Sequence, residues 1–432
     1  MAIAIHKPRD PESRLSGYDL GILARLNMIG GGRMVDLYRF RRFLYERSGL
    51  VLWLLSITTA LAIAALKPQI HSVLPAYEFG AAMFSSERPL YDLNTAMGYV
   101  YAPAFAVFYA PFAALGSHVG GILWRLLGVC TLTVATIKQA RVIDKSNAMA
   151  LASTAFFLAI PLSLGAIRNG QATVLFTAAC WMLILSARDN CRAATVAWAL
   201  VALVAKPTAI VVILLTGAIR PRLIPFLVFA IALAFAIPYA FASIEYVNEQ
   251  HLEFFRLLTS MSANSSGTFE AADFTAPFTA LNISLSANVT IILRAVAAGV
   301  VLLTSLWLDH RGDRQLRSFV IFLLAAYYMT VFNPRVESNT YLMLVVPTAL
   351  AISLMKIRCE NRRIPLVLGA AIFLCGWTGV SHDLHSALNP WFKPAAMSLI
   401  ALPICHWLIR QSTEPSSSSL SDTRTEPQNA DL

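Results

Sequence analysis

The sequence has little charge. Only 13% of its 432 residues are Asp, Glu, Lys or Arg, whereas 57% are hydrophobic. Soluble domains carry about 25% charged residues, so the composition excludes an ordinary soluble protein. Apolar runs long enough to cross a bilayer recur from residue 49 to residue 410. We therefore predict an all-α polytopic membrane protein.

Cysteine is also scarce, and its pattern excludes two further classes of protein. The six cysteines are scattered and lack a CxxC spacing, so neither a disulfide framework nor a metal site is predicted. His382, Asp383 and His385 are close in sequence, but an exposed loop between helices accounts for them. No cleavable signal peptide is visible, because the first apolar run begins only near Gly49.

The chain divides into three predicted segments. Residues 1–48 form a basic cytoplasmic segment that ends either in an interfacial helix or simply in a basic orientation signal, and residues 411–432 form a disordered cytoplasmic tail. Residues 49–410 form the membrane domain. Its predicted crossings number about twelve, at residues 49–66, 119–137, 148–165, 172–186, 193–205, 208–219, 223–243, 288–308, 318–332, 341–355, 364–380 and 394–410.

The distribution of basic residues supports this arrangement. The formal net charge is +10, but the segments predicted to lie inside hold 25 of the 34 Lys and Arg residues and those outside hold seven. Such a bias is typical of topology signals and indicates no nucleic-acid partner.

Residues 99–115 are apolar, but they are few and include two prolines. We interpret them as a re-entrant or interfacial helix that leads into the crossing at 119–137. If residues 99–115 crossed the membrane fully, the orientation of the helices that follow would be inverted. Merging residues 193–219 into one crossing would restore the orientation from that point on. A full crossing at 99–115 would also place Lys138, Arg141 and Lys145 outside, against the charge rule.

Two long external loops are predicted, at residues 67–104 and 244–287. The first gathers Glu78, Glu87, Asp92 and four tyrosines, and the second begins with an amphipathic stretch suited to the outer membrane surface. Three short polar interruptions share the same predicted face, at residues 168–171, 206–207 and 333–341. Charges so close to the membrane plane usually line a cavity, pair with one another or contact a ligand.

Glycosyl transfer from a lipid-phosphate sugar would use these residue types. A carboxylate takes the proton of the acceptor hydroxyl, cations and amides stabilise the departing phosphate, and tyrosines and amides hold a sugar. The candidate catalytic residues are Glu78 and Glu337. The candidate substrate-binding residues are Tyr77, Asp92, Arg168, Asn169, Gln171, Lys206, Asn333, Arg335, Asn339 and Tyr341.

Several of these residues also have simpler interpretations. Arg335 and Glu337 can neutralise each other, Lys206 can extend to the interface, and Asp92 can cap a helix or turn. Arg125 and Arg294 fall within helices, where we expect them to pair inside the bundle.

The ordered set of motifs resembles the family-87 glycosyltransferases, the polyprenol-phosphate-mannose-dependent mannosyltransferase group of the GT-C superfamily. The matching pieces lie within residues 50–345: Tyr77 to Gly80-Ala81-Ala82 and Pro89-Leu90-Tyr91-Asp92, Tyr101 to Pro111, Asn169-Gly170-Gln171, and Ala205-Lys206-Pro207. The resemblance implies a GT-C-like helical bundle, a polyprenyl-phosphate sugar as donor, a lipid or glycan acceptor at the external face, and inversion without a bound nucleotide sugar. We predict no cofactor.

One position departs from the family pattern. Family members usually carry an Asp, the presumed catalytic base, four residues before the tyrosine equivalent to Tyr77, and here that position is Val73. Either Glu78 or Glu337 replaces that base, or the chain has lost or changed its activity.

We therefore predict a hexosyltransferase in the plasma membrane with both termini cytoplasmic. The alternatives are a non-catalytic family member in envelope glycan assembly and a transporter or flippase of a lipid-linked substrate. Transporters usually show two related halves, and no such repeat is visible in the sequence.

Overall fold

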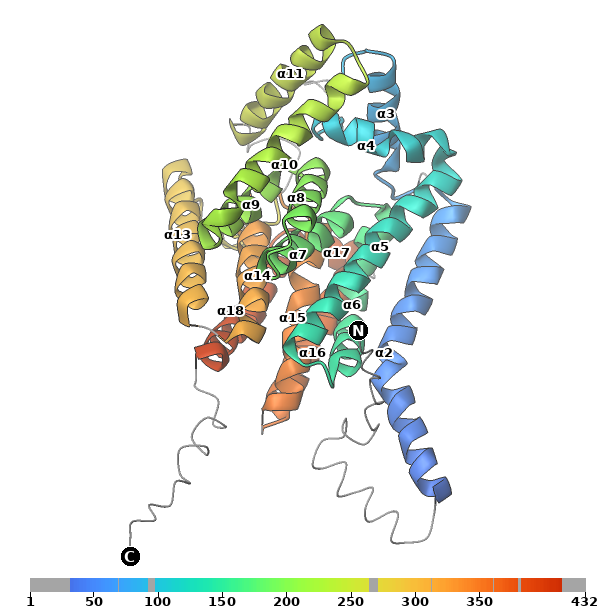
Figure 1. The fold of residues 1–432 in the computed structure, drawn as a ribbon, viewed down its shortest axis with the longest axis vertical. Coiled ribbons are helices and arrows are strands. Elements are labelled where there is room, and N and C mark those ends of the chain that lie inside the picture. Colours follow the sequence, from blue (N-terminus) through green and yellow to red (C-terminus); the bar gives the residue numbers. More distant parts are fainter. Residues whose placement is uncertain are drawn as a thin grey trace, which may run out of the picture.

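A computed structural model describes residues 32–68, 70–91, 98–263, 271–311, 313–359, 361–379 and 382–413. Every regular element in these ranges is a helix, as the composition predicts (Figure 1). Seven segments are long and apolar enough to cross a membrane: Glu46–Leu66, Gly116–Ile143, Ala148–Asn169, Pro221–Ala240, Ala287–Arg311, Ser338–Arg358 and Phe392–Thr413. The chain is thus an integral membrane protein.

The seven segments correspond to α2 (Gly32–Leu66), α5 (Gly116–Ile143), α6 (Ala148–Asn169), η3 (Pro221–Leu223) with α10 (Ile224–Ala236) and η4 (Ile237–Ala240), α13 (Ala287–Arg311), η5 (Ser338–Tyr341) with α15 (Leu342–Arg358), and α18 (Phe392–Thr413). Five other predicted crossings are shorter helices: α7 (Thr173–Arg188), α8 (Arg192–Ala205), η2 (Pro207–Ala209) with α9 (Ile210–Ile219), α14 (Arg314–Val331), and α16 (Arg363–Cys375) with η6 (Gly376–Gly379). The total of twelve crossings and the GT-C-like bundle stay predictions.

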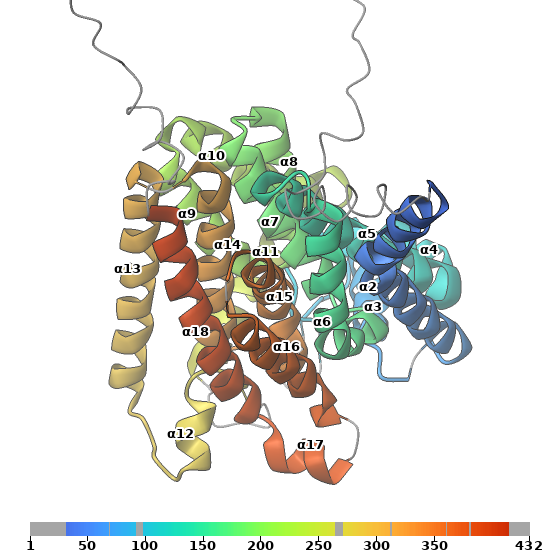
Figure 2. The same ribbon diagram turned by 90° about the horizontal axis from the view of Figure 1, so that it is seen from below.

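The core lies where α6 packs between α2 and α15 (Figures 1 and 2). Small residues let these helices approach closely, as is usual in membrane proteins. A Cβ added to Gly49 of α2 would lie 2.1 Å from the carbonyl oxygen of Ser153 in α6. Nearly all of α15 is buried, so it forms the centre of the bundle.

The bundle has two ends with different chemistry. We call them the loop end, which holds Gln171 and Glu337, and the arginine end, which holds Arg188 and Arg317. Both α7 and α14 run between these ends: α7 starts after Gln171 and ends at Arg188, and α14 starts near Arg317 and ends before Glu337. Because α14 has 18 residues, the two ends lie about 27 Å apart along it.

Helices α8 and α9 are separate and antiparallel. Arg192, which starts α8, lies over the Phe226 ring, and Arg220, which follows α9, pairs with Asp309 at the arginine end. The turn between them, at Lys206, lies at the loop end, within electrostatic reach of Glu337. The alternative in which residues 193–219 merge into one crossing is therefore wrong.

Residues 99–115 end in a short helix, α4 (Pro103–Ala114), which packs against α3 (Leu74–Ser85) at the loop end (Figure 1). Twelve residues span about 18 Å, less than the ~30 Å of a bilayer core. Gly116 has a φ of +76°, a conformation that glycine adopts readily, and it turns the chain into α5. The length of α4 favours our interpretation that this segment does not cross.

Two helices extend beyond the boundaries predicted from the sequence. Helix α2 is continuous from Gly32 to Leu66, so the described part of the basic segment belongs to the same helix as the first predicted crossing. Helix α18 continues to Thr413, three residues beyond the predicted end of the last crossing. Residues 414–432 of the predicted tail lie outside the described ranges.

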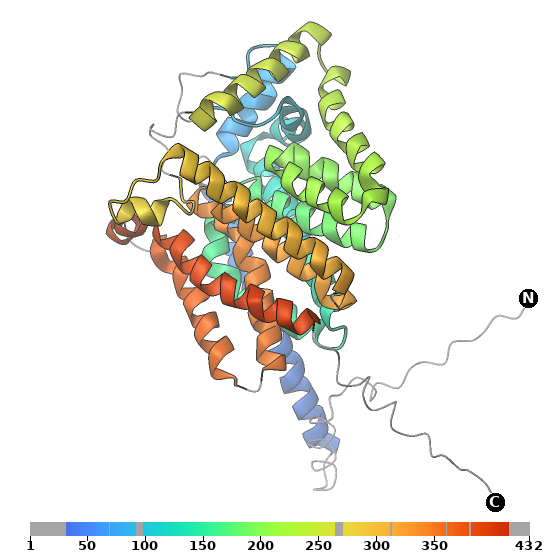
Figure 3. The same ribbon diagram turned by 90° about the vertical axis from the view of Figure 1, so that its left-hand side faces the viewer.

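The two loops predicted to be external contact each other at the loop end. The second loop forms α11 (Ile244–Ala263), as its amphipathic pattern predicts. The Tyr246 hydroxyl donates to the Arg88 carbonyl (2.7 Å), and the Gln250 side chain accepts from the Leu90 N–H (2.8 Å). Figures 2 and 3 show the small helices α12 (Ala276–Ala280) and α17 (His382–Leu388) together at one edge of the bundle.

Candidate active site

The candidate active site is built around the junction of α6 and α7. Gly170 ends α6 with a φ of +70°, which favours glycine because an L side chain is strained there. A Cβ at this position would also lie 2.8 Å from Leu74 of α3. The resulting tight turn brings the buried Gln171 to the loop end.

Gln171 connects two distant parts of the chain. Its Nε2 donates to Oε2 of Glu337 at 2.8 Å, across 166 residues of sequence. The Oε1 of Gln171 is buried without a hydrogen-bond partner among the described residues, whereas Glu337 is exposed. A neutral amide thus orients one carboxylate oxygen, and the other oxygen has no hydrogen bond in the described part of the chain.

Tyr77 anchors α3 to the same junction. Its hydroxyl accepts from the Ala172 N–H (3.1 Å) and is 2.9 Å from the Tyr101 hydroxyl. Its ring makes edge contacts with Phe105 and Trp124. Burial raises the pKa of Tyr77 well above the usual tyrosine value, with a smaller contribution from Tyr101. Tyr77 is therefore a neutral, fully buried support, and the half-buried Tyr101 lies closer to solvent.

Positive charge surrounds Glu337. Lys206, at the end of α8, is half-buried, and its pKa is lowered by burial, while Glu337 acts in the opposite direction. The pKa of Arg335 is likewise lowered by burial and raised by Glu337. The carboxylate thus lies within electrostatic reach of two cations from different segments.

Glu78 lies elsewhere. Neighbouring helical residues point about 100° apart, so Glu78 points in a different direction from Tyr77. Its Oε2 accepts from the Ser117 hydroxyl at 3.0 Å, at the start of α5. The structure therefore does not bring the two candidate bases together: of the two, only Glu337 contacts Gln171 and lies within electrostatic reach of Lys206.

Arg168 and Asn169 contribute through their backbone. The Arg168 carbonyl accepts from Nε and a terminal nitrogen of Arg125, at 3.0 and 2.8 Å, so Arg125 is satisfied inside the bundle as expected. The Asn169 carbonyl accepts from the Val73 N–H at 3.0 Å. The Arg168 Nε is buried without a hydrogen-bond partner among the described residues.

The remaining predicted residues are more dispersed. Asn333 accepts from the Arg335 N–H (3.2 Å) and so orders its own turn. Asn339 lies against Gly165 of α6. Tyr341 is fully buried, and its hydroxyl donates to the Ala272 carbonyl at 2.8 Å, so the structure places it in the core. Asp92 and the side chains of His382 and His385 lie outside the described residues.

Two residues near the site were not among those predicted from the sequence to form it. Tyr101 touches Tyr77, and Lys393 of α18 donates to the Ser338 carbonyl, next to Glu337, at 3.3 Å. The Tyr-x-Pro pattern was a signal for Tyr101. Nothing local in the sequence marks Lys393, because its neighbours come from distant segments.

The sequence model of glycosyltransferase family 87 matches residues 99–334, more than half of the chain. The protein belongs to glycosyltransferase family 87. It is therefore a membrane glycosyltransferase, with a sugar donor and an acceptor as substrates. A search of curated proteins found no match.

The family-87 match covers some of the site and omits the rest. Tyr101, Gln171 and Lys206 lie inside the matched segment, whereas Tyr77 and Glu337 lie outside it. Both candidate bases are therefore beyond the matched residues. Membership in the family therefore supports glycosyl transfer but does not identify the catalytic base, which has to be inferred from the geometry of the site.

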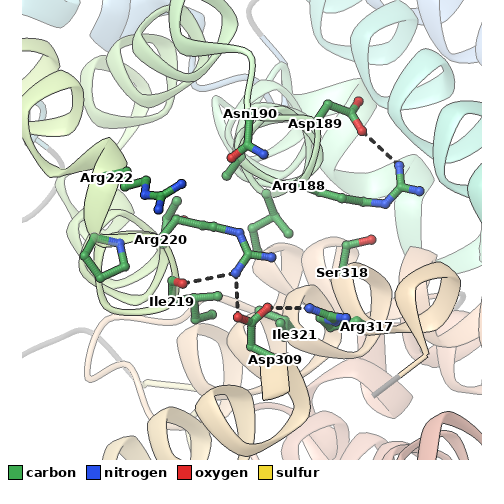
Figure 4. A pocket seen from close by; sticks show the side chains of 14 residues that line it. Arg188, Asp189, Asn190, Ile219, Arg220, Arg222, Asp309, Arg317, Ser318 and Ile321 are labelled. Carbon is green, nitrogen blue, oxygen red and sulfur yellow. Dashed lines mark hydrogen bonds and ion pairs between the residues drawn. The ribbon is translucent and has the colours of Figure 1, made fainter. Parts of the chain in front are cut away.

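This family-87 protein also contains a cavity of about 520 Å³ at the arginine end (Figure 4). We place the candidate active site at the loop end instead, because the carboxylate, amide, tyrosine and cations that glycosyl transfer requires meet there. Among the described residues, no three His, Cys, Asp or Glu side chains are grouped in a way that could hold a metal ion.

Proposed function

We propose that the protein transfers a hexose, specifically mannose, from a polyprenyl-phosphate sugar to a lipid or glycan acceptor at the external face of the plasma membrane, with both termini cytoplasmic. The observation that carries the proposal is the meeting of Glu337, Gln171 and Lys206 at the loop end. These residues come from three separate helix junctions. Together they provide a carboxylate, an amide and a cation, the groups that suit the displacement of a phosphate by a hydroxyl.

Glu337 is the proposed general base. The acceptor hydroxyl loses its proton to the carboxylate as its oxygen forms a bond to the anomeric carbon. The bond from that carbon to the phosphate oxygen breaks, and the electron pair leaves with the lipid phosphate. One such displacement inverts the anomeric centre. The exposed side chain of Glu337 is accessible to an acceptor, and the Gln171 hydrogen bond holds its orientation.

The proposed role of the cations is to stabilise the leaving phosphate. Preorganised charges in a partly dry site act strongly where new charge develops. Lys206 and Arg335 share the electrostatic surroundings of Glu337, and the buried Nε of Arg168 is without a hydrogen-bond partner among the described residues. We propose that Tyr101 and Asn169, both half-buried, contact the sugar. Because these cations supply the positive charge, we expect transfer to continue after removal of divalent metal with a chelator.

The test compares three carboxylates. The purified full-length protein would receive radiolabelled polyprenyl-phosphate mannose, or the glucose analogue, together with total membrane lipids as acceptors. Glu337→Gln preserves the shape of the side chain and should lower the transfer rate about 10²- to 10⁴-fold, the usual contribution of a general base. Glu253→Gln is the matched control, because Glu253 pairs with Arg256 on the surface of α11, and it should leave transfer unchanged.

Glu78→Gln distinguishes the two candidate bases. If Glu78→Gln abolishes transfer while Glu337→Gln retains it, the base is Glu78 and our assignment is wrong. A folded wild-type protein that transfers neither sugar would favour the non-catalytic alternative that Val73 suggests. Transfer of glucose in preference to mannose would overturn the proposed donor sugar and leave the site intact.

A further inference from the structure

The cavity at the arginine end is too far from Glu337 to serve the transfer reaction. It lies between the ends of α7, α9 and α13 and the start of α14. Its volume of about 520 Å³ falls within the range of small-molecule sites, about 300–1,000 Å³. The length of α14 separates it from the candidate active site by about 27 Å.

The charges that line this cavity are predominantly positive. Four arginines face two aspartates: Arg188, Arg220, Arg222 and Arg317 against Asp189 and Asp309. Figure 4 shows Asp309 between Arg220 and Arg317, at 2.5 and 2.8 Å. Each carboxylate already has two cationic neighbours, because Asp189 pairs with Arg188 (2.9 Å) and with Lys138 (3.6 Å). The surplus charge therefore favours an anionic ligand.

Two buried hydroxyls in the cavity wall have unused hydrogen-bonding capacity. Thr216 and Ser318 are each 4% exposed, and neither hydroxyl has a hydrogen-bond partner among the described residues. Some buried hydroxyls elsewhere, such as those of Thr177 and Ser186, donate to the carbonyl four residues earlier, whereas others, such as that of Ser305, also have no partner among the described residues. A buried hydroxyl without a hydrogen-bond partner is unfavourable, and an oxygen-rich ligand would satisfy both.

The orientation of the chain in the membrane does not account for this arrangement. Positive charges on the cytoplasmic side are sufficient for topology, and exposed arginines such as Arg362 and Arg363 supply them without forming a cavity. Topology signals require neither a cavity nor buried hydroxyls without partners. The combination indicates a binding site.

We infer that the cavity at the arginine end binds a phosphate group, held by Arg188 and Arg222 and by the hydroxyls of Thr216 and Ser318. Guanidinium groups bind phosphate oxygens through paired hydrogen bonds. The phosphate can belong to a membrane lipid or to a soluble ion. The apolar side chains of Ile184, Ile219 and Ile321 in the same wall suit the start of a lipid chain. The inference does not depend on the proposed transfer reaction.

The test measures binding to the full-length protein in a neutral detergent. The probes are dihexanoyl phosphatidic acid and sodium phosphate, and the readout is the dissociation constant from isothermal titration calorimetry. The double variant Arg188→Gln/Arg222→Gln leaves both Asp309 pairs intact and should weaken phosphatidic acid binding at least tenfold. The control Arg362→Gln/Arg363→Gln removes two exposed arginines outside the cavity and should bind like the wild type.

A second double variant, Thr216→Val/Ser318→Ala, covers the case in which the arginine variant fails to fold. It should weaken binding several-fold without lowering the melting temperature, because neither hydroxyl has a partner to lose among the described residues. If sodium phosphate displaces phosphatidic acid, the site exists and also accepts a soluble phosphate ion. If only the lipid binds, the site exists and the phosphate group belongs to a lipid. Equal affinity in both cavity variants and the control would overturn the inference.

Discussion

The ion pair between Asp273 and Arg294 is predicted to support the segment that carries Glu337. Asp273 is only 1% exposed, and its Oδ2 accepts from Arg294 at 2.8 Å. Its other oxygen accepts from the N–H and the hydroxyl of Thr275, at 2.9 and 2.6 Å. On either side, the Ala272 N–H donates to the Val336 carbonyl (2.7 Å), and the Phe274 N–H to the Val331 carbonyl (2.8 Å). The pair thus fixes a segment bonded to the residues just before Glu337.

The expected loss of stability in Arg294→Gln follows from the different burial of Asp273 and Arg294. The substitution leaves a fully buried carboxylate without its cation, and breaking such a pair costs about 3–5 kcal/mol. Asp273→Asn is expected to cost less, because the Arg294 side chain is 24% exposed and lies over the Phe274 ring. Combining both substitutions leaves two neutral amides, so the double variant should be more stable than Arg294→Gln by about 1–3 kcal/mol.

The measurement is the free energy of unfolding in mixed micelles, followed by circular dichroism as SDS is added. Transfer activity is measured in parallel at a temperature at which Arg294→Gln remains folded. We expect a lower rate, because Glu337 loses part of its support. A destabilisation below about 1 kcal/mol for Arg294→Gln, or a double variant as unstable as the sum of its single variants, would refute the reasoning.

Three further predictions concern the site, the fold and the topology. Burial lowers the pKa of Lys206 from its ordinary value of 10.5, so activity that needs its charge should fall as the pH rises through that lowered pKa. Lys206→Arg should remove this alkaline decrease from the pH–rate profile, because arginine stays charged, and an unchanged profile would contradict the role of Lys206. Gly170→Ala should lower the melting temperature, with a cost of at least about 1–2 kcal/mol for the left-handed backbone, whereas Gly299→Ala, with open space around it, should not. In a background without other cysteines, Ser86→Cys should react with an impermeant reagent from outside only and the exposed Cys191 from inside only, and the reverse result would invert the predicted topology.

The helices were largely predictable, because each crossing must satisfy its backbone hydrogen bonds within an apolar segment. The predicted crossing at 148–165 corresponds to α6 (Ala148–Asn169), and that at 193–205 to α8 (Arg192–Ala205). Helix ends were less predictable. Helix α2 extends from Gly32 without interruption, since a change from basic to apolar side chains does not by itself break a helix.

The composition of the candidate site was partly predictable. Alternating crossings placed residues 168–171, 206–207 and 333–341 on one side, and the structure brings Gln171, Lys206 and Glu337 together there. The assignment of Tyr341 to substrate was not supported in the same way. That residue is buried beneath the site, and a sequence pattern does not distinguish a tyrosine that faces the core from one that faces a cavity.

The sequence by itself determined that this protein is a helical membrane protein, because hydropathy and charge asymmetry are properties of the chain. It also determined which residue types were available for glycosyl transfer. Only the tertiary structure decided between Glu78 and Glu337 as the carboxylate beside the amide and the cations. The physical reason is that hydrogen bonds act over about 3 Å, and whether residues separated by 166 positions come that close depends on how the helices pack.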